Sequence, residues 1–230
     1  MRFFNQLSAI FNQIIIHLLM RIILCVLLAY FSVHAAAQEL DFRDYRTKKE
    51  SFTKIPEKDV RADIASFAVG GIDESIGKLP LTKIGVGKYE SNFMSFESND
   101  IKVLITTGRF EPSQHKLTKD EDHLVKIDNK PFYGNYGETP KNHIQSLIVL
   151  IDKDTIPIPA TAYTDLCNVN FTYRDKAGTE RSNNGIYLSK DKRKVYIYLL
   201  NKAGDGGYEA TWVIQDKKFL RRVLDYGMIK

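Results

Sequence analysis

Apolar residues after position 60 occur in short runs that predict mainly β-strands. The runs are rich in β-branched and aromatic residues, and turn residues separate them at intervals of roughly 8–12 positions, which is typical of antiparallel meanders. A short helix is expected at 160–167, because Pro159 stands at a helix-start position. The pattern predicts a mainly β fold, either a β-sandwich or an open-barrel-like sheet with one or two short helices; an α+β fold is the alternative. Strands are expected at 63–69, 88–97, 101–110, 123–127, 145–152, 155–158, 168–174, 184–189, 194–201, 208–215 and 218–226.

The last three strands are expected to form a meander with a defined register. A loop at 202–206 and a two-residue turn at 216–217 would place Trp212 opposite both Tyr196 and Arg221. Because side chains alternate along a strand, one face would then carry an aromatic stripe. We expect this face to be either half of the core or a partly open stacking platform for a sugar ring or a peptide. The candidate ligand-binding residues on it are Tyr196, Tyr198, Trp212 and Arg221, with Tyr208 on the same face.

The same meander would bring two basic turns to one end of the sheet. Their positive charge could attract a phosphate-rich envelope surface, whereas the alternative is that lysines at a hairpin end only improve solubility and discourage edge pairing. The candidate anionic-surface patch consists of Lys190, Lys192, Arg193, Lys194, Lys217 and Lys218, opposed by Asp191 and Asp216.

The first 37 residues have the features of an export signal. They contain Arg2 and Arg21 but no acidic residue, and the apolar run 22–31 leads to an Ala-Ala-Ala sequence that ends at Ala37. A positive start, a short apolar stretch and small residues at the exit are typical of a secretory signal peptide. Met20 is an alternative start that gives a more compact signal. We therefore expect an exported protein, periplasmic or extracellular, with cleavage after Ala37 and no transmembrane span afterwards. The mature chain would comprise a polar, flexible segment at 38–60 and a single β-rich domain at 61–230.

Composition excludes several classes of protein. Apolar residues make up 43% of the chain and the 14 Gly and 7 Pro are ordinary numbers, so the chain is neither disordered nor collagen-like. The formal net charge is +5, and it falls to +3 without residues 1–37, so no nucleic-acid partner is expected. Only Cys167 remains after the signal peptide, so the mature chain has no internal disulfide. We expect this cysteine to be buried and inert.

No motif identifies a catalytic centre. The sequence has no G-x-S-x-G, G-x-G-x-x-G, P-loop, HExxH or CxxC pattern, so no catalytic residue and no cofactor are assigned. His115 and His123 flank an acidic run at 120–122, and His143 is the third histidine of the mature chain. Their spacing is not a recognised metal-ligand pattern, so we expect a solvated loop and no metal.

Two functions from different classes remain. The first is an exported, non-enzymatic β-rich domain that binds an envelope or extracellular glycan, peptide or protein. The alternative is an exported hydrolase whose acidic and histidine groups meet only in space. A deep cleft that gathers His115, His123 or His143 with acids would favour the hydrolase, and a flat aromatic patch would favour the binding domain.

Overall fold

The computed structural model describes residues 20–21, 46, 48–74, 81–202 and 206–227. The chain divides after Arg43 into two compact units, and the second unit, Asp44–Lys230, contains both large sheets. Apart from Met20 and Arg21, the expected signal peptide lies outside the described residues. The elements are η1 (Phe52–Lys54), α2 (Lys58–Ile64), η2 (Val69–Glu74), β1 (Thr82–Ile84), β2 (Lys88–Tyr89), β3 (Phe93–Glu97), β4 (Ile101–Arg109), η3 (Pro112–Gln114), β5 (Leu117–Asp120), β6 (His123–Ile127), β7 (Asn142–Ile151), β8 (Asp154–Thr155), η4 (Ala160–Ala162), β9 (Tyr173–Arg174), β10 (Glu180–Arg181), β11 (Gly185–Leu188), β12 (Lys194–Asn201), β13 (Tyr208–Gln215) and β14 (Lys218–Tyr226), where η denotes a 3-10 helix.

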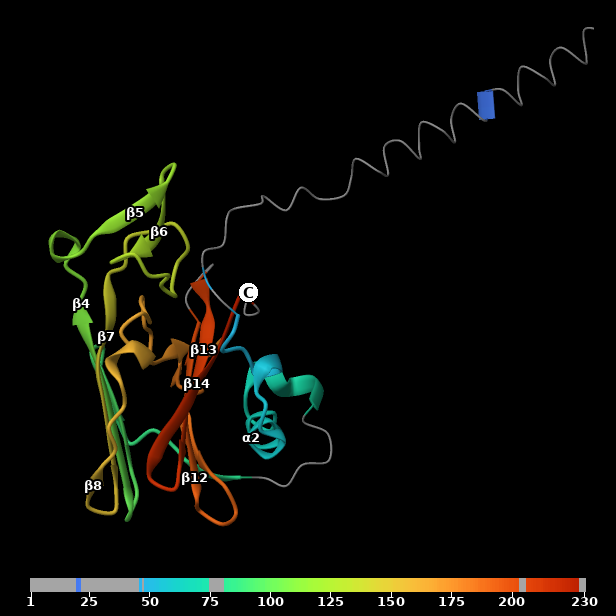
Figure 1. Cartoon of the computed structure of the whole chain (residues 1–230), viewed down its shortest axis with the longest axis vertical. Helices are drawn as coiled ribbons and strands as arrows, with labels where there is room; N and C mark the ends of the chain where they lie inside the picture. Colours follow the sequence, from blue (N-terminus) through green and yellow to red (C-terminus); the bar gives the residue numbers. More distant parts are fainter. Residues whose placement is uncertain (1–19, 22–45, 47, 75–80, 203–205, 228–230) are drawn as a thin grey trace, which may run out of the picture. The chain divides into compact units, whose positions relative to one another are not determined.

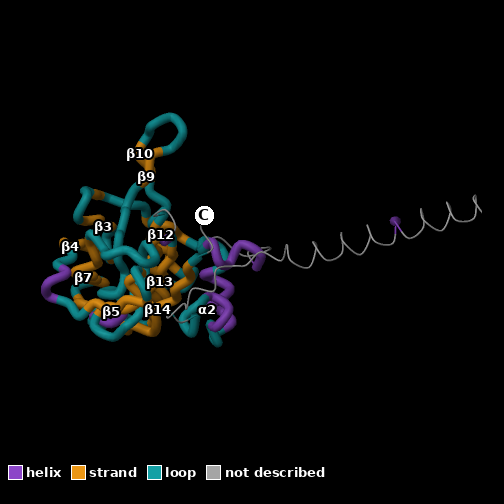
Figure 2. The backbone as a smooth tube through the Cα atoms, turned by 90° about the horizontal axis from the view of Figure 1, so that it is seen from above, coloured by secondary structure: helices purple, strands orange, loops and turns teal. Residues whose placement is uncertain are grey.

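Two five-stranded sheets make up most of the second unit. The β12 sheet has the strand order β1-β11-β12-β13-β14, and the β4 sheet has the order β2-β3-β4-β7-β8. All neighbouring strands within them are antiparallel. The hairpin β5–β6 lies beyond one end of β4 and β7 (Figure 1), and the small hairpin β9–β10 projects from the sheets (Figure 2). The predicted mainly β, antiparallel fold is therefore confirmed.

The main hydrophobic core lies between the two sheets. Met94 and Phe96 from β3 and Val149 from β7 belong to the same buried cluster as Ile197 and Trp212 from the β12 sheet. The sheets thus pack face to face as a sandwich (Figure 1). Strand β4 alternates between buried and more exposed positions, because only one of its faces meets this core.

Strand β12 is buried on both faces, as its apolar sequence predicts. Its residues Val195, Ile197 and Leu199 join the core between the sheets. On the opposite face, Tyr196 and Tyr198 join a second cluster, which residues 52–68 of the N-terminal segment cover. The helix α2 of that segment lies on the outer side of the β12 sheet (Figure 1).

The N-terminal segment 48–74 is packed and partly helical, in contrast to the flexible segment expected at 38–60 and the strand expected at 63–69. Phe52 and Ile55 are at most 3% exposed. Val60 and Ile64 are one helical turn apart, so α2 turns both of them towards the sheet. The main chain continues in turns after the helix, since the Ala68 N–H donates to the Ile64 carbonyl at 2.9 Å. Local turns therefore replace the expected strand.

Other expected elements are shorter than predicted because tertiary hydrogen bonds compete with them. The helix expected at 160–167 is reduced to η4, since the Ala162 carbonyl accepts the Trp212 indole N–H at 2.7 Å. The strand expected at 168–174 is reduced to β9. There the Val169 and Asn170 N–H groups donate to the side chains of Asn142 and Asn201, at 2.7 and 2.9 Å.

Candidate functional site

The expected aromatic platform is wrong, because the register of β12 on β13 is shifted by one residue from the prediction. Ile197, rather than Tyr196, lies opposite Trp212. Tyr196 and Tyr198 consequently lie in the cluster beneath the N-terminal segment, and Trp212 lies between the two sheets. All three are at most 2% exposed. They therefore act as core residues on opposite faces of the sheet.

The register shift originates in the loop after β12. Asn201 pairs with Tyr208, so the loop includes Gly207 in addition to the expected residues. Gly206 lies so close to Gly134 that a Cβ at Gly206 would be 2.3 Å from the Gly134 carbonyl oxygen. This long-range contact fixes where the loop ends and hence the pairing that follows.

Arg221 does not lie opposite Trp212, because β14 contains a bulge. The pairing of Ile214 with Phe219 is as predicted, but the register then shifts, so that Arg222 faces Trp212 and Arg221 faces Val213. The extra residue of the bulge is Leu220, which is 39% exposed. Arg221 thus points to the side of the N-terminal segment, where it pairs with Glu57.

The basic turns do meet at one end of the β12 sheet, but Asp216 of one turn and acidic residues from other segments neutralise much of their charge. Arg193 binds Asp216 through Nε and Nη2, both at 2.7 Å, and Lys194 lies 2.9 Å from Asp59. Further ion pairs join Lys194 to Asp63 and Lys217 to Asp152 and Asp154. Lys190, Lys192 and Lys218 are exposed. This end is a set of surface ion pairs rather than an unopposed positive patch.

A cavity of about 280 Å³, which we call the histidine pocket, is the strongest candidate for a binding site. It lies beside the β5–β6 hairpin and gathers two of the three histidines in the described part of the chain with aromatic and acidic residues. Its lining includes Phe110, His115, Asp128, Phe132, His143 and Cys167. His123 lies elsewhere and stacks on Tyr136.

Hairpin geometry positions the first half of this pocket. The turn after β6 has Asp128 and Asn129 at φ 51° and 62°, which directs Asp128 back towards the residues before β5. The Asp128 carboxylate accepts the Lys116 N–H at 2.8 Å and lies 2.7 Å from Nδ1 of His115. The hydrogen bond to His115, followed by that from Lys116, lowers the pKa of Asp128. His115 also stacks on Phe110, with ring centroids 4.6 Å apart.

The second half of the pocket comes from the start of β7 and the segment that pairs with it. His143 forms an isolated antiparallel bridge with Cys167 and meets the Phe110 ring edge-on at 6.1 Å. Burial, and then the proximity of His115, lowers the pKa of His143, so its imidazole is neutral at pH 7. Its Nδ1 is buried and has no hydrogen-bond partner in the described part of the chain. Burial, and then the charge of Asp165, raises the pKa of the Cys167 thiol, which keeps it protonated.

No protein-family model, curated protein or solved structure matches the chain. Function is thus inferred from the sites alone. Among the described residues, no three His, Cys, Asp or Glu side chains gather as a metal site, and none of the helices has the length and apolar character needed to cross a bilayer.

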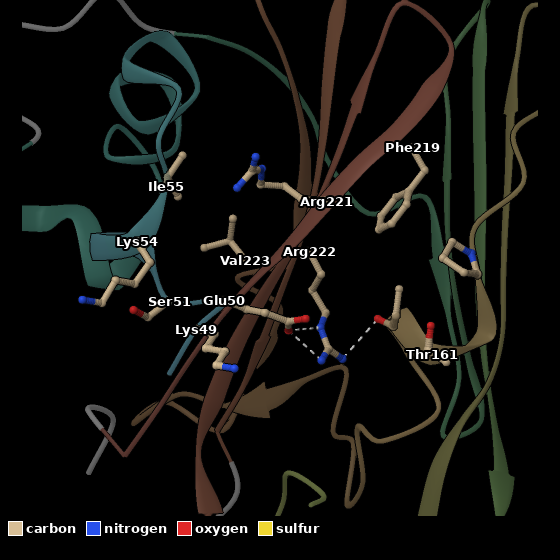
Figure 3. A pocket seen from close by; sticks show the side chains of 12 residues that line it. Lys49, Glu50, Ser51, Lys54, Ile55, Thr161, Phe219, Arg221, Arg222 and Val223 are labelled. Carbon is tan, nitrogen blue, oxygen red and sulfur yellow. Dashed lines mark hydrogen bonds and ion pairs between the residues drawn. The ribbon is translucent and has the colours of Figure 1, made fainter. Parts of the chain in front are cut away.

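A second cavity, the arginine groove, lies along β14 and has a volume of about 250 Å³ (Figure 3). Residues from 49–55, 159–162 and 219–223 line it. Arg222 is held on the core side by Glu50, 2.8 Å from its Nε, and by Asp165, 2.5 and 2.9 Å from its Nη1 and Nη2. Arg221 points to the opposite side of the strand (Figure 3), and its Nε is buried without a partner among the described residues.

Sequence reasoning singled out His115 and His143 but missed Phe110 and Asp128. The missing signal is the β5–β6 hairpin, because the region of the acidic run at 120–122 is expected to be a solvated loop. Strand β5 pairs Leu117 with Ile127, and this register alone brings Lys116, the residue before β5, next to Asp128. The turn residues Asp128 and Asn129 indicate such a hairpin only when a strand is also recognised on the other side of the turn.

Proposed function

We propose that the chain is an exported, non-enzymatic recognition domain whose histidine pocket binds one ring of an envelope or extracellular glycan, or a ring-bearing side chain of a peptide or protein. The observation that carries this proposal is the lining of the pocket. Phe110 and Phe132 supply apolar surface, while His115, Lys130 and His143 supply polar groups. Sites for small ligands typically combine an apolar lining with a few polar groups that fix orientation.

The size and hydrogen-bonding capacity of the pocket support a ring-sized ligand. A volume of about 280 Å³ lies at the lower end of small-ligand pockets, so it suits one ring rather than a long chain. A neutral His143 can donate from one ring nitrogen and accept at the other, as a ligand hydroxyl requires. A bound hydroxyl could also supply the partner that its buried Nδ1 lacks.

Glycan and peptide arrays, followed by calorimetry with the ligands they identify, test the proposal. Binding on the glycan array alone would identify a sugar ring as the ligand, and binding on the peptide array alone would identify a ring-bearing side chain. His143→Ala should weaken binding by about two- to tenfold, the effect of one lost hydrogen bond. His123→Ala is the matched control, since His123 lies outside the pocket, and it should leave affinity unchanged. Equal effects of the two substitutions would reject the histidine pocket as the site.

Export is tested separately by the mass of the protein purified from its source. Cleavage after Ala37 gives a mature protein that begins at Gln38. A protein that retains residues 20–37 would contradict this part of the proposal.

The second candidate is an exported hydrolase, and the pairing of His115 with Asp128 favours it. A carboxylate that orients a histidine is the arrangement found in general-base catalysis. The pocket also gathers two histidines with Asp128 and Asp165, which supports this second candidate. Asp165, however, is engaged by Arg222, and the Cys167 thiol is protonated. Turnover of chromogenic esters, glycosides or peptides that His115→Ala abolishes and His123→Ala preserves would establish the hydrolase instead.

A further inference from the structure

The β2–β3 turn and the base of the β9–β10 hairpin border a third cavity, which we call the hairpin groove. Residues 89–91, 142, 169–172 and 180 line it. Its volume is about 460 Å³, larger than that of the histidine pocket, and the two linings have no residue in common. The β9–β10 hairpin itself projects from the sheets (Figure 2). The groove is therefore a separate candidate site.

Buried asparagine side chains hold the floor of the groove in place. The Asn170 N–H donates to Oδ1 of Asn201 at 2.9 Å, and Nδ2 of Asn184 donates to the Phe171 carbonyl at 2.8 Å. Asn184 and Asn201 are themselves only 2% and 0% exposed. This main chain is fixed before any ligand arrives, so binding does not have to order it.

One wall of the groove is an aromatic ring without a partner. Tyr89 is 39% exposed, and its ring contacts no other ring and no cation in the part of the chain that the structure describes. It lies in β2, which forms an edge of the β4 sheet. An open aromatic face in a polar groove offers an apolar surface on which a ring of similar size can stack.

The polar groups around this ring include both donors and acceptors of hydrogen bonds. The side chains of Ser91 and Asn170 are exposed and form no hydrogen bond with the described residues. Each of them can donate and accept, whereas the carboxylates of Glu90 and Glu180 only accept. Neither glutamate forms an ion pair with the described residues, and the lining contains no Lys, Arg or His.

This lining disfavours three classes of ligand. An apolar molecule would bury the polar groups without hydrogen bonds, and an anion would meet two carboxylates and no basic side chain of the lining. An ammonium group only donates, so it would leave the donors of Ser91 and Asn170 unpaired. A neutral sugar combines an apolar ring face with hydroxyls that both donate and accept.

We propose that the hairpin groove binds a neutral saccharide, with one sugar ring stacked on Tyr89 and its hydroxyls bonded to Ser91, Asn170 and Glu90. A volume of about 460 Å³ lies within the range of small-ligand sites. The inference does not rest on the function proposed for the histidine pocket, and either site can fail without the other.

The test titrates the protein into the millimolar range with the methyl glycosides of glucose, galactose, mannose and N-acetylglucosamine. Binding is followed by the amide chemical shifts of Ser91 and Glu180 in NMR, because these residues line the hairpin groove and not the histidine pocket. At least one glycoside should shift both amides. Sorbitol has the hydroxyls without the ring, and methylammonium has the charge alone, so both should shift these amides much less.

Variants at Tyr89 test the stacking. Tyr89→Ala should weaken binding of the best glycoside about three- to tenfold, whereas Tyr89→Phe keeps the ring and should stay within about twofold of the wild type. Ile148→Ala is the matched control, since Ile148 is 42% exposed and lies outside the groove, and it should have no effect. Unchanged amide shifts elsewhere in the protein show that each variant is folded.

A second pair of variants tests the role of charge. The methyl glycoside of glucuronic acid should bind more weakly than methyl glucoside, and Glu90→Gln should narrow this difference. Glu121→Gln, in the turn between β5 and β6, should leave it unchanged. The proposal is overturned if no glycoside shifts the two amides, if sorbitol or methylammonium shifts them as much as the best glycoside, or if Tyr89→Ala and Ile148→Ala weaken binding equally.

Discussion

Trp212 is expected to be a stability residue rather than a ligand-binding one, and its removal tests the register of the β12 sheet. Its side chain is 0% exposed in the core between the sheets, and its indole N–H donates to the Ala162 carbonyl at 2.7 Å. Trp212→Ala removes the largest side chain of this core and leaves a cavity, which costs about 3–5 kcal/mol of unfolding free energy. Since small domains are stable by only about 5–15 kcal/mol, the variant should be strongly destabilised.

A second substitution separates the volume of the indole from its hydrogen bond. Trp212→Phe keeps an aromatic ring, and the Ala162 carbonyl still has Nη1 of Arg222 at 3.3 Å. The cost should therefore be smaller, about 1 kcal/mol for the hydrogen bond plus a reduced cavity penalty. Tyr89→Ala is a control at a 39% exposed aromatic residue and should change stability by less than about 0.5 kcal/mol.

These differences in unfolding free energy are measured by urea unfolding followed by far-UV circular dichroism. Tryptophan fluorescence is unsuitable, because the chain has a single tryptophan and both variants remove it. If Trp212→Ala remained within about 1 kcal/mol of the wild type and lost a ligand instead, the residue would be part of an open platform. The core assignment would then be refuted.

Three further predictions concern buried groups. Burial raises the pKa of Glu209, so the native state binds a proton more readily than the unfolded chain does. The unfolding free energy of the wild type, minus that of Glu209→Gln, should therefore rise as the pH falls from 7. A difference that does not change with pH in urea titrations would contradict this. Cys167 should react with a thiol reagent only after unfolding, whereas rapid labelling of the native protein would show that the pocket exposes it. Gly206→Ala should cost about 1–3 kcal/mol because its Cβ would overlap Gly134, while Gly85→Ala, with nothing within 4 Å, should be nearly neutral in the same measurement.

The C-terminal strands were predictable because their signals are local. The bounds of β12, β13 and β14 follow from apolar runs that end at turn residues, and the two-residue turn at Asp216 and Lys217 adopts the positive φ values of 49° and 60° that a tight hairpin uses. The register between β12 and β13 was not predictable, since the loop length depends on the contact of Gly206 with a distant glycine. Because of this one-residue error, Tyr196 and Tyr198 were expected on the face of Trp212, whereas they lie on the opposite face of the sheet.

Elements that depend on tertiary contacts were missed in the same way. Helix α2 has only seven residues, and the burial of Val60 and Ile64 against the sheet stabilises it more than its own propensity does. The partners of the basic turns, such as Asp59 and Asp152, come from segments far away in sequence. The sequence pointed to the two histidines of the pocket separately, but not to the pocket itself. Its lining is assembled only when the β5–β6 hairpin, the turn after β6 and the start of β7 come together.

The contacts between the N-terminal segment and β14 also constrain when the protein can finish folding. The Phe52 N–H binds Asp225 across 173 residues of chain, and Arg222 binds Glu50 across 172. Contacts of such sequence separation are closed late, because the chain loses much conformational freedom before they form. Residues 48–64 are synthesised long before β14, so Glu50 and Phe52 have no partner at this edge until β14 is made. A growing chain therefore cannot complete this domain from its N-terminus onwards, because the hydrogen bonds that fix the N-terminal segment to the sheet edge form only once the last strand is in place.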